Sequence, residues 1–387
     1  MRKLAIITTH PIQYNAPLFA LLHQRANIKV KVFYTWGDSV NKKKYDPGFG
    51  KNIEWDIPLL QGYDFSFVTN TSTEPGSHHF KGIVNPTLND EIKQWGATAI
   101  LVFGWAFKSH LTCIRYFHGK IPVLFRGDST LLSRQPFIKK VLRNFFLTWV
   151  YKHIDYALYV GKQNKFYFKR YGLKDKQLIY APHAIENERF RDDSQQYEML
   201  AQTWKDELGI KAGEMVILYA GKLEAIKDTG ILIELATKLR PLAVRFLIVG
   251  NGPLEETLKS SVKDNKQFIF LDFQNQRKMP LVYRLGDLFI LASKSETWGL
   301  SINEAMASGR PILVRDTCGC ATDLVTDDLN GYVFNAADLD WLAHKIKFIF
   351  DNRAKLSYMG NQSLKKIESY SFVHIAEAVE SVMYKIE

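Results

Sequence analysis

The sequence of 387 residues contains few cysteines and no long apolar segment, and both absences restrict the kind of protein it encodes. Three cysteines, Cys113, Cys318 and Cys320, are too few for a disulfide framework, which indicates a reducing compartment. Cys318 and Cys320 have no nearby His or Cys partners and therefore do not indicate a metal site. The apolar run after Met-Arg-Lys is too short for a signal peptide, and no run reaches the ~18 residues of a membrane-spanning helix. We expect a cytoplasmic protein.

Acidic residues are scarce in the first half of the chain. Residues 1–180 contain 26 Lys and Arg against 11 Asp and Glu, a net charge of +15, whereas the remaining residues contain 25 against 29, a net charge of −4. This asymmetry indicates that the first half faces an anionic partner. An anionic membrane surface and nucleic acid both fit. Because no compact RNA- or DNA-reading motif is present and the second half is acidic, we expect no nucleic-acid partner.

Short apolar runs typical of buried strands recur through both halves. They are LAIITT, VKVFYTW, AILVFG, PVLFRG, YALYV and QLIYAP, then MVILYAG, RFLIVG, FIFLDF, LFILAS, PILVR and GYVF. Strands that alternate with helices predict an α/β fold with parallel sheets, here two Rossmann-like domains facing each other across a cleft. The predicted domains are residues 1–190, residues 191–365 and a C-terminal helix within residues 366–387 that packs back on the first domain.

Two glutamates flank a Trp-Gly-Leu turn in the stretch SKSETWGLSINEAMASGRPILV. The pattern predicts a strand over 288–291, a short helix over 301–308 and a second strand after Pro311. Glu296 then lies on a loop at the carboxyl end of a strand, and Glu304 lies about one turn into the helix. Ligands of open parallel sheets bind in such places.

The start of this predicted helix suits a nucleotide sugar. The amides of Gly299, Leu300 and Ser301 are donors for phosphate or sugar oxygens, and the two carboxylates can accept hydrogen bonds from hydroxyls. The alternative is a first-turn helix charge and a solvated loop residue.

Two other loops follow strands of the second half. In YAGKLEAIKDTG, Lys222 and Lys227 suit a diphosphate and would stabilise its charge as it leaves, unless they are solvated surface lysines. In LIVGNGPLEE, Gly250 and Gly252 follow a strand, but Glu255 stands where a dinucleotide-binding fingerprint needs a third glycine.

In the order in which they occur, these stretches resemble the retaining glycosyltransferases of family 4, which have the GT-B fold. The matching pieces are PHAIENERF, GKLEAIKDTG, VGNGP, FLDF, SETWGLSINEAMASGRPIL, TDLVTDDLNGYVF and YSFVHIAEAV, so the resemblance covers nearly the whole chain. The spacing of the two glutamates within this order is highly specific. The resemblance is closest to members that assemble exopolysaccharides or other cell-surface glycans.

The resemblance implies roles for the residues of the second half. Glu296, with the backbone of Trp298, Gly299 and Leu300, would hold hydroxyls of the donor sugar, and the amides of Leu300 and Ser301 would reach a phosphate. Glu304 would accept hydrogen bonds from the ribose. Lys222 and Lys227 would neutralise the diphosphate, although the family commonly has Arg at the position of Lys222, which changes the geometry but not the charge. Gly250 and Gly252 belong to the donor loops, and no metal or other cofactor is implied.

The first half departs from the family pattern. Many relatives have a glycine pair after the first strand, where this chain reads THPIQYNAPLF, so that His10, Gln13 and Tyr14 are the candidates to line the acceptor side. A structural role for His10 is the alternative. Relatives often have a histidine after the strand that here reads PVLF, where this chain has Arg126 and Asp128. Arg126 would bind phosphate or acceptor and Asp128 would orient an acceptor hydroxyl, or the stretch is a plain turn.

Two further stretches of the first half have two interpretations each. YDPGFGKNIEWDIPLL, with Tyr45 and Asp46, resembles the exopolysaccharide subgroup and is expected on the acceptor side, or it is a surface loop. FIKKVLRNFFLTWVYKHIDY predicts a basic, aromatic helix that rests on anionic headgroups, or a helix that faces the core with its cations extended into water.

Together these observations predict a retaining glycosyltransferase that moves a sugar, of hexose type, from a nucleoside diphosphate sugar to an acceptor hydroxyl on a glycan or a lipid-linked glycan. The expected location is the cytoplasm, peripheral at the inner face of the plasma membrane. A GT-B sugar-nucleotide epimerase and a basic nucleic-acid-binding protein are the alternatives.

Overall fold

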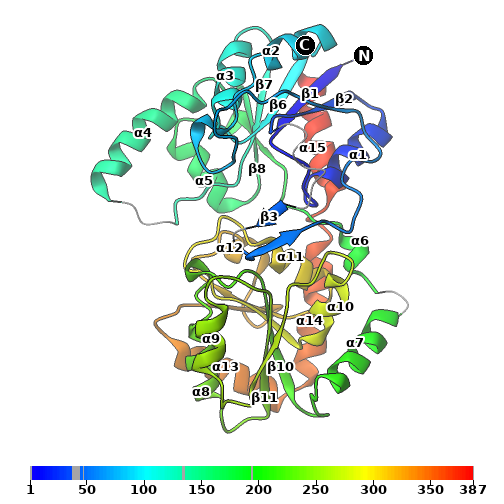
Figure 1. Cartoon of the computed structure of the whole chain (residues 1–387), viewed down its shortest axis with the longest axis vertical. Coiled ribbons are helices and arrows are strands. Elements are labelled where there is room, and N and C mark those ends of the chain that lie inside the picture. The colour runs from blue at the N-terminus through cyan, green and yellow to red at the C-terminus, as the bar shows by residue number, and fades with distance from the viewer. Residues whose placement is uncertain (1, 37–43, 47, 133–135, 193–194, 387) are drawn as a thin grey trace. The chain divides into compact units, whose positions relative to one another are not determined.

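The protein folds into two α/β domains, in a computed structural model that describes residues 2–36, 44–46, 48–132, 136–192 and 195–386 (Figure 1). The first domain comprises the described residues before position 37, residues 58–184 and the residues from 371 onward. The second domain comprises residues 44–57 and 185–370. The chain therefore leaves the first domain for a short segment that ends at residue 57, and again from residue 185 to residue 370.

The first domain is built on a parallel sheet of seven strands within the described residues. In spatial order the strands are β5 (Phe65–Phe67), β2 (Lys29–Tyr34), β1 (Lys3–Thr8), β6 (Ala99–Phe103), β7 (Val123–Arg126), β8 (Tyr156–Tyr159) and β9 (Leu178–Tyr180). The register pairs Lys3 with Lys29 and Leu4 with Ala99. Each apolar run predicted in this half is a strand, whereas β5 was not predicted.

Helices cover both faces of this sheet. They are α1 (Ala16–Arg25), α2 (Leu88–Trp95), α3 (Lys108–Phe117), α4 (Phe137–Tyr151), α5 (Lys162–Arg170) and α15 (Phe372–Lys385), with the 3-10 turns η2 (Phe80–Gly82) and η3 (Asp175–Gln177). Alternate residues of β1 point into opposite layers: Leu4 and Ile6 pack with α1 and α15, and Ala5 and Ile7 pack with α2 and α3. Because Glu380 of α15 also forms an ion pair of 2.9 Å with Arg25 of α1, the C-terminal helix is part of the first domain.

The second domain contains a parallel sheet of six strands within the described residues. In spatial order they are β12 (Phe268–Leu271), β11 (Val244–Val249), β10 (Met215–Ala220), β13 (Leu288–Leu291), β14 (Ile312–Arg315) and β15 (Gly331–Phe334). Every apolar run predicted in this half is one of these strands. The prediction of two parallel α/β domains is therefore confirmed.

The second domain surrounds its sheet with helices of 4 to 14 residues. They are α6 (Asn187–Phe190), α7 (Gln196–Glu207), α8 (Ile231–Lys238), α9 (Glu255–Ser261), α10 (Met279–Leu285), α11 (Leu300–Ala307), α12 (Ala321–Leu324), α13 (Leu339–Asp351) and α14 (Ala354–Ile367), with the 3-10 turn η4 (Ala225–Lys227). Residues of α8 and α13 form one apolar core with β10 and β11. The helix α11, which carries Glu304, contacts β13, β14 and α14.

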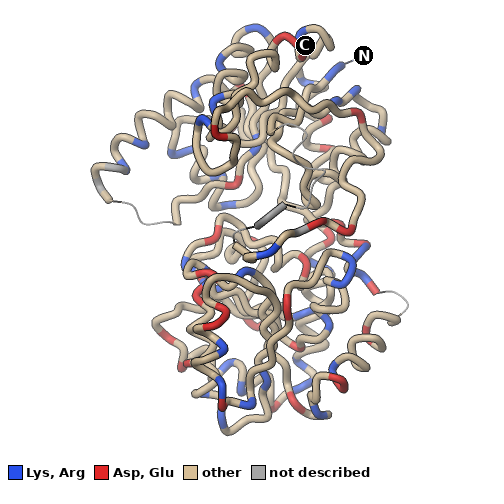
Figure 2. The backbone as a smooth tube through the Cα atoms, viewed as in Figure 1, with Lys and Arg blue, Asp and Glu red and all other residues tan. Residues whose placement is uncertain are grey.

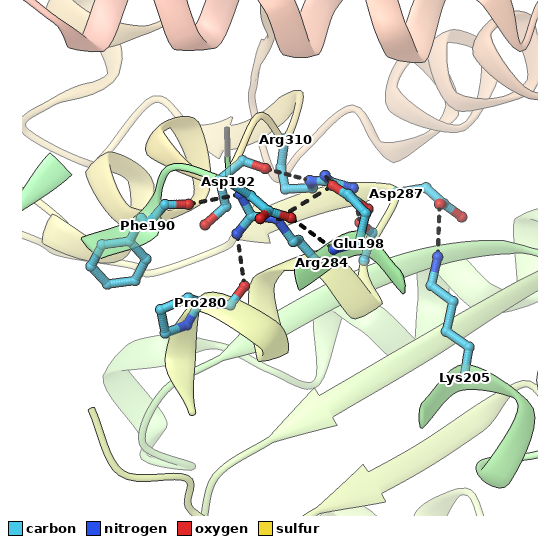
Figure 3. A network of polar contacts seen from close by, with 10 residues as sticks. Phe190, Asp192, Glu198, Lys205, Pro280, Arg284, Asp287 and Arg310 are labelled. Carbon is cyan, nitrogen blue, oxygen red and sulfur yellow. Dashed lines mark hydrogen bonds and ion pairs between the residues drawn. The ribbon is translucent and has the colours of Figure 1, made fainter. Parts of the chain in front are cut away.

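A buried arginine fixes the polar linker to the second domain (Figure 3). The guanidinium of Arg284, on α10, donates hydrogen bonds to the carbonyl oxygens of Pro280 (2.9 Å) and Phe190 (2.7 Å). It also lies 3.4 Å from a carboxylate oxygen of Glu198 on α7, which in turn pairs with Arg310. Because a buried charge is tolerated only where it is paired and hydrogen-bonded, this network holds α7 in a defined position.

A short antiparallel hairpin, β3 (Lys44–Asp46) with β4 (Lys51–Ile53), belongs to the second domain although it lies between β2 and β5 in the sequence.

Candidate functional site

The loop between β13 and α11 ends at a glycine that the geometry requires. Gly299 has a φ of +103°, in the left-handed region, and a Cβ there would lie 2.7 Å from Cδ2 of Leu291. This conformation lets α11 begin at Leu300, directly after the turn. The amides of Leu300 and Ser301 are in the first turn of α11, where a helix provides no internal acceptor for them. The structure therefore places the predicted anion-binding amides at a helix N-terminus.

Lys227 and Glu296, two predicted catalytic residues, form an ion pair. Lys227 ends η4 in the loop after β10, and Glu296 lies in the loop after β13. The two loops are joined by a hydrogen bond of 2.8 Å from the amide of Lys294 to the carbonyl oxygen of Ile226. The backbone of Glu296 is held in turn by the amide of Gly319, which donates to its carbonyl oxygen at 3.0 Å. A cation and a carboxylate that are 69 residues apart in the chain thus meet at the carboxyl ends of neighbouring strands.

Glu304 is more buried than a residue that only borders a cleft. Its side chain belongs to α11, the residue is 3% exposed, and its Oε2 accepts a hydrogen bond of 2.6 Å from the hydroxyl of Tyr283 on α10. Trp298 is also buried, and its indole Nε1 donates to Oδ1 of Asn303 at 2.9 Å. The Trp298 side chain therefore anchors the loop inside the domain, which agrees with a role for its backbone.

Gly250 and Gly252 bring the loops after β10 and β11 into contact. A Cβ at Gly250, whose φ is +131°, would lie 2.1 Å from the carbonyl oxygen of Gly221, and a Cβ at Gly252 would lie 2.6 Å from that of Leu223. The amide of Leu223 donates to the carbonyl oxygen of Asn251 at 3.0 Å. These glycines therefore permit a close backbone approach that fixes the loop carrying Lys222. The weak dinucleotide interpretation is not needed to explain them.

The turn between β3 and β4 lies next to Lys222, a position that the sequence did not indicate. The sequence left the loop YDPGFGKNIEWDIPLL as either an element of the acceptor side or a surface loop, and in the structure residues 48–57 pack on the second domain. The ammonium of Lys222 lies 5.0 Å from the ring centre of Phe49, and that ring lies 4.7 Å from the ring of Phe273. Lys51 forms an ion pair of 3.1 Å with Asp272.

Gly48 shows how closely this turn fits. The glycine is buried, and a Cβ at this position would lie 2.4 Å from Oε1 of Glu224 and 2.6 Å from Nζ of Lys222. The only feature of the sequence that could have indicated this contact is an aromatic residue between two glycines, followed by a lysine. The side chains of Tyr45 and Asp46, which the same interpretation named, lie outside the described part of the chain.

The candidates after β1 lie in one loop of the first domain. Nδ1 of His10 is 2.9 Å from Oγ1 of Thr9, and its ring packs edge-on against Trp36 at 5.2 Å. Gln13 is buried and Tyr14 is half-buried at the start of α1. Their roles at the acceptor stay predictions.

Arg126 has a structural function in the first domain. It is buried at the end of β7, and its guanidinium donates hydrogen bonds of 2.9 Å to the carbonyl oxygens of both Ala181 and Pro182. Burial lowers the pKa of Arg126 to about 10, against the opposing effect of the Asp128 carboxylate, so that the side chain stays charged at neutral pH. Asp128 lies 3.7 Å from Nε2 of His183, a residue of the PHAI stretch that sequence reasoning did not single out. If Arg126 binds a phosphate or the acceptor, it must use those N–H groups of its guanidinium that do not donate to these two carbonyl oxygens.

Among the described residues, the structure contains no group of three or more His, Cys, Asp or Glu side chains that could hold a metal ion. In the same part of the chain, no helix combines the length and the apolar character needed to cross a bilayer.

Comparison with known proteins places the candidate donor residues inside one family model. Residues 201–366 match the family described as glycosyl transferases group 1, and this range contains Lys222, Lys227, Glu296 and Glu304. The chain is 30% identical over 187 residues to a D-inositol 3-phosphate glycosyltransferase of Nocardia farcinica, a match that covers 45% of this chain and 41% of that protein. It is 35% identical over 179 residues to an alpha-monoglucosyldiacylglycerol synthase of Acholeplasma laidlawii, with 44% of each chain covered. The chain thus matches less than half of the length of these curated relatives.

The similarity in structure extends further than the similarity in sequence. The crystal structure of Anabaena HepE in complex with UDP and glucose matches over the full length of both chains with a TM-score of 0.70 and 14% sequence identity. At this identity the likeness establishes the fold. The chain therefore has the two-domain GT-B fold, and its residues 201–366 match the family model of glycosyl transferases group 1.

Proposed function

We propose that this protein is a retaining glycosyltransferase that transfers a hexosyl group from a nucleoside diphosphate sugar to an acceptor hydroxyl in the assembly of cell-surface glycans. The observation that carries the proposal is the Lys227–Glu296 ion pair, which lies beside the N-terminus of α11 within the group 1 domain. A solved protein of the same fold was crystallised with UDP and glucose, and two relatives are named for transfer to inositol phosphate or for synthesis of a glucosyl diacylglycerol.

The ion pair prepares the site for a negatively charged donor. Lys227 and Glu296 compensate each other's charge. When a diphosphate binds, Lys227 and Lys222 can turn to its oxygens, and Glu296 is then available to accept hydrogen bonds from hydroxyls of the sugar. As the bond to the leaving diphosphate breaks, negative charge grows on the phosphate oxygens, so that the two ammonium groups stabilise the transition state more than the bound donor.

Retention would follow from attack on the same face of the sugar. The bond from the anomeric carbon to the phosphate oxygen breaks, and a bond from that carbon to the acceptor oxygen forms on the same side. The acceptor proton passes to the departing phosphate oxygen, so no protein nucleophile is required. We propose that no metal takes part, because the lysines supply the cationic charge that a metal would provide. Chelation with EDTA should then leave the rate unchanged.

We also place the enzyme in the cytoplasm, at the inner face of the plasma membrane, with a glycan or a lipid-linked glycan as acceptor. The support is the charge of the first half of the chain, a net +15 over residues 1–180, and the lipid product in the name of the Acholeplasma relative.

The experiment that tests the proposal compares products with and without an acceptor. The purified protein is incubated with a panel of nucleoside diphosphate sugars, first alone and then with glycan or lipid-linked acceptors, and all products are identified by mass spectrometry and NMR. A transferase releases nucleoside diphosphate in step with a glycosylated acceptor. If the donor alone is converted to its epimer, the protein is an epimerase and the proposal is wrong.

A further inference from the structure

The helix α4 has an apolar face that the first domain does not cover. Ile138, Leu142 and Phe145 are 73%, 67% and 71% exposed, respectively. Their spacing of four and three residues places them on one side of the helix, and we call these three residues the outer face of α4. The sequence allowed two interpretations of this helix, one with its aromatic residues in the core. The structure shows that these three are not in the core.

The opposite side of α4 attaches the helix to the domain. Leu147 and Val150 are fully buried, and Tyr151 lies in the core cluster with Phe125 and Phe168. The fold is therefore already satisfied by the inner side of the helix, and the outer face contributes little to it. Three large apolar side chains on one face that water surrounds are typical of a surface that binds a partner or a membrane.

The charge around the outer face has one sign. No acidic residue occurs between Asp128 and Asp155, and this stretch contains Arg134, Lys139, Lys140, Arg143 and Lys152. Figure 2 shows the basic positions along α4 without an acidic one among them. Lys140 and Lys152 are exposed. Arg143 instead donates a hydrogen bond of 3.3 Å to the hydroxyl of Tyr167, so it also has a structural role.

We propose that the outer face of α4 inserts into the headgroup region of an anionic lipid bilayer, with Lys140 and Lys152 held at the surface by the lipid phosphates. A helix that lies in the interface needs an apolar face and neighbouring cations, and α4 has both. A helix that binds a protein surface of mixed charge is expected to have some acidic residues for complementarity, and α4 has none. The inference deepens the proposed function, since it rests on a membrane location for the transferase and identifies the surface that holds it there.

The direct test is co-sedimentation of the full chain with two kinds of vesicle. One kind contains phosphatidylcholine alone, and the other contains phosphatidylcholine with roughly 30–40% phosphatidylglycerol, which imitates an anionic leaflet. We expect binding to the anionic vesicles only, weakened at high salt because charge attraction is screened. The variant Ile138→Ser/Leu142→Ser/Phe145→Ser should bind at least about tenfold more weakly, since three apolar groups no longer enter the bilayer. Lys140→Glu/Lys152→Glu should lose about fivefold or more for each cation.

Matched controls separate the surface from general changes in hydrophobicity or charge. Met199→Ser/Leu200→Ser removes two side chains of α7 that are 64% and 47% exposed, and Lys263→Glu/Lys266→Glu reverses two exposed lysines of the second domain. Both controls should bind vesicles like the unchanged protein. All variants should keep the same melting temperature, because every substituted side chain is exposed.

Three results would overturn the inference: equal binding to neutral and anionic vesicles, unchanged binding of the triple-serine variant, or a concentration-dependent dimer that the triple-serine substitution abolishes. The last result would make the outer face an interface between two copies. Transfer to a soluble acceptor analogue is measured in parallel. Vesicle binding without any transfer would refute the proposed function alone, and transfer without vesicle binding would refute the membrane surface alone.

Discussion

Replacement of Glu304 by glutamine is the perturbation whose effect the structure defines most closely. Glu304 is buried on α11 and accepts a hydrogen bond from the Tyr283 hydroxyl at one carboxylate oxygen. A carboxylate offers about four acceptor positions, so the bond from Tyr283 uses only part of this capacity. If the ribose of the donor is recognised here, its hydroxyls donate to the same carboxylate. The amide of Glu304→Gln can still accept the hydrogen bond from Tyr283, and we expect the fold to be kept.

The magnitude follows from the strength of hydrogen bonds to charged groups. Such a bond contributes about 1.5–3 kcal/mol, so the variant should bind nucleoside diphosphate roughly 10- to 150-fold more weakly. Glu304→Ala should lose a similar factor but should also be less stable by about 1–3 kcal/mol, because it leaves the buried Tyr283 hydroxyl without this acceptor. The stability cost distinguishes the two substitutions.

Titration calorimetry with a nucleoside diphosphate and its 2′,3′-dideoxy analogue provides the assay. The unchanged protein should prefer the ribonucleotide, and Glu304→Gln should bind both ligands equally, since a double-mutant cycle isolates the contact between the carboxylate and the hydroxyls. Tyr283→Phe, which keeps the carboxylate, is the control and should retain the preference. If Glu304→Gln discriminates between the two ligands as well as the unchanged protein does, Glu304 does not bind the ribose.

Three other changes test separate parts of the account. Lys227→Ala and Lys222→Ala should lower kcat by about a hundredfold with a smaller effect on the KM for donor, because charge on the diphosphate is largest in the transition state; steady-state kinetics that show a rise in KM alone would contradict this. Gly250→Ala should reduce the free energy of unfolding by roughly 2 kcal/mol or more, since it puts a methyl carbon 2.1 Å from a backbone carbonyl oxygen, whereas Gly230→Ala, which meets open space, should have little effect in the same urea titration. Burial lowers the pKa of His110 to about 4. Below pH ~6.5 this histidine therefore binds a proton in the unfolded chain, whereas in the folded chain it stays neutral until the pH approaches 4. Stability should therefore fall by up to about 3 kcal/mol between pH 6.5 and pH 4, and His110→Asn should remove most of this loss; equal slopes for both proteins would show that His110 is not the cause.

Local patterns in the sequence predicted the helix α11 and every strand of the two large sheets except β5, because each of these elements is encoded in consecutive residues. The run 288–291, the turn at Gly299 and the helix with Glu304 all occur where they were expected. Periodicity and glycine positions suffice for such elements, since they depend on contacts within a few residues.

The parts that were not predicted depend on contacts between distant residues. Lys51 pairs with Asp272 across 221 positions, and no local signal indicates that residues 48–57 join the second domain. The hydrogen bonds from the guanidinium of Arg126 to the carbonyl oxygens of Ala181 and Pro182 were also not indicated by the sequence, and a ligand role for Arg126 stays a prediction. The apolar spacing on α4 fits a buried and an exposed helix face equally well, so only the structure shows which side is covered.

The anomeric configuration of the product decides whether the transfer retains the configuration of the donor sugar. The protein is mixed with an α-linked nucleoside diphosphate sugar and an acceptor, and the earliest glycosylated product is followed by NMR. We expect an α-linked product that appears together with free nucleoside diphosphate, both in the presence and in the absence of EDTA. A β-linked first product, or conversion of the donor that does not require an acceptor, would contradict it.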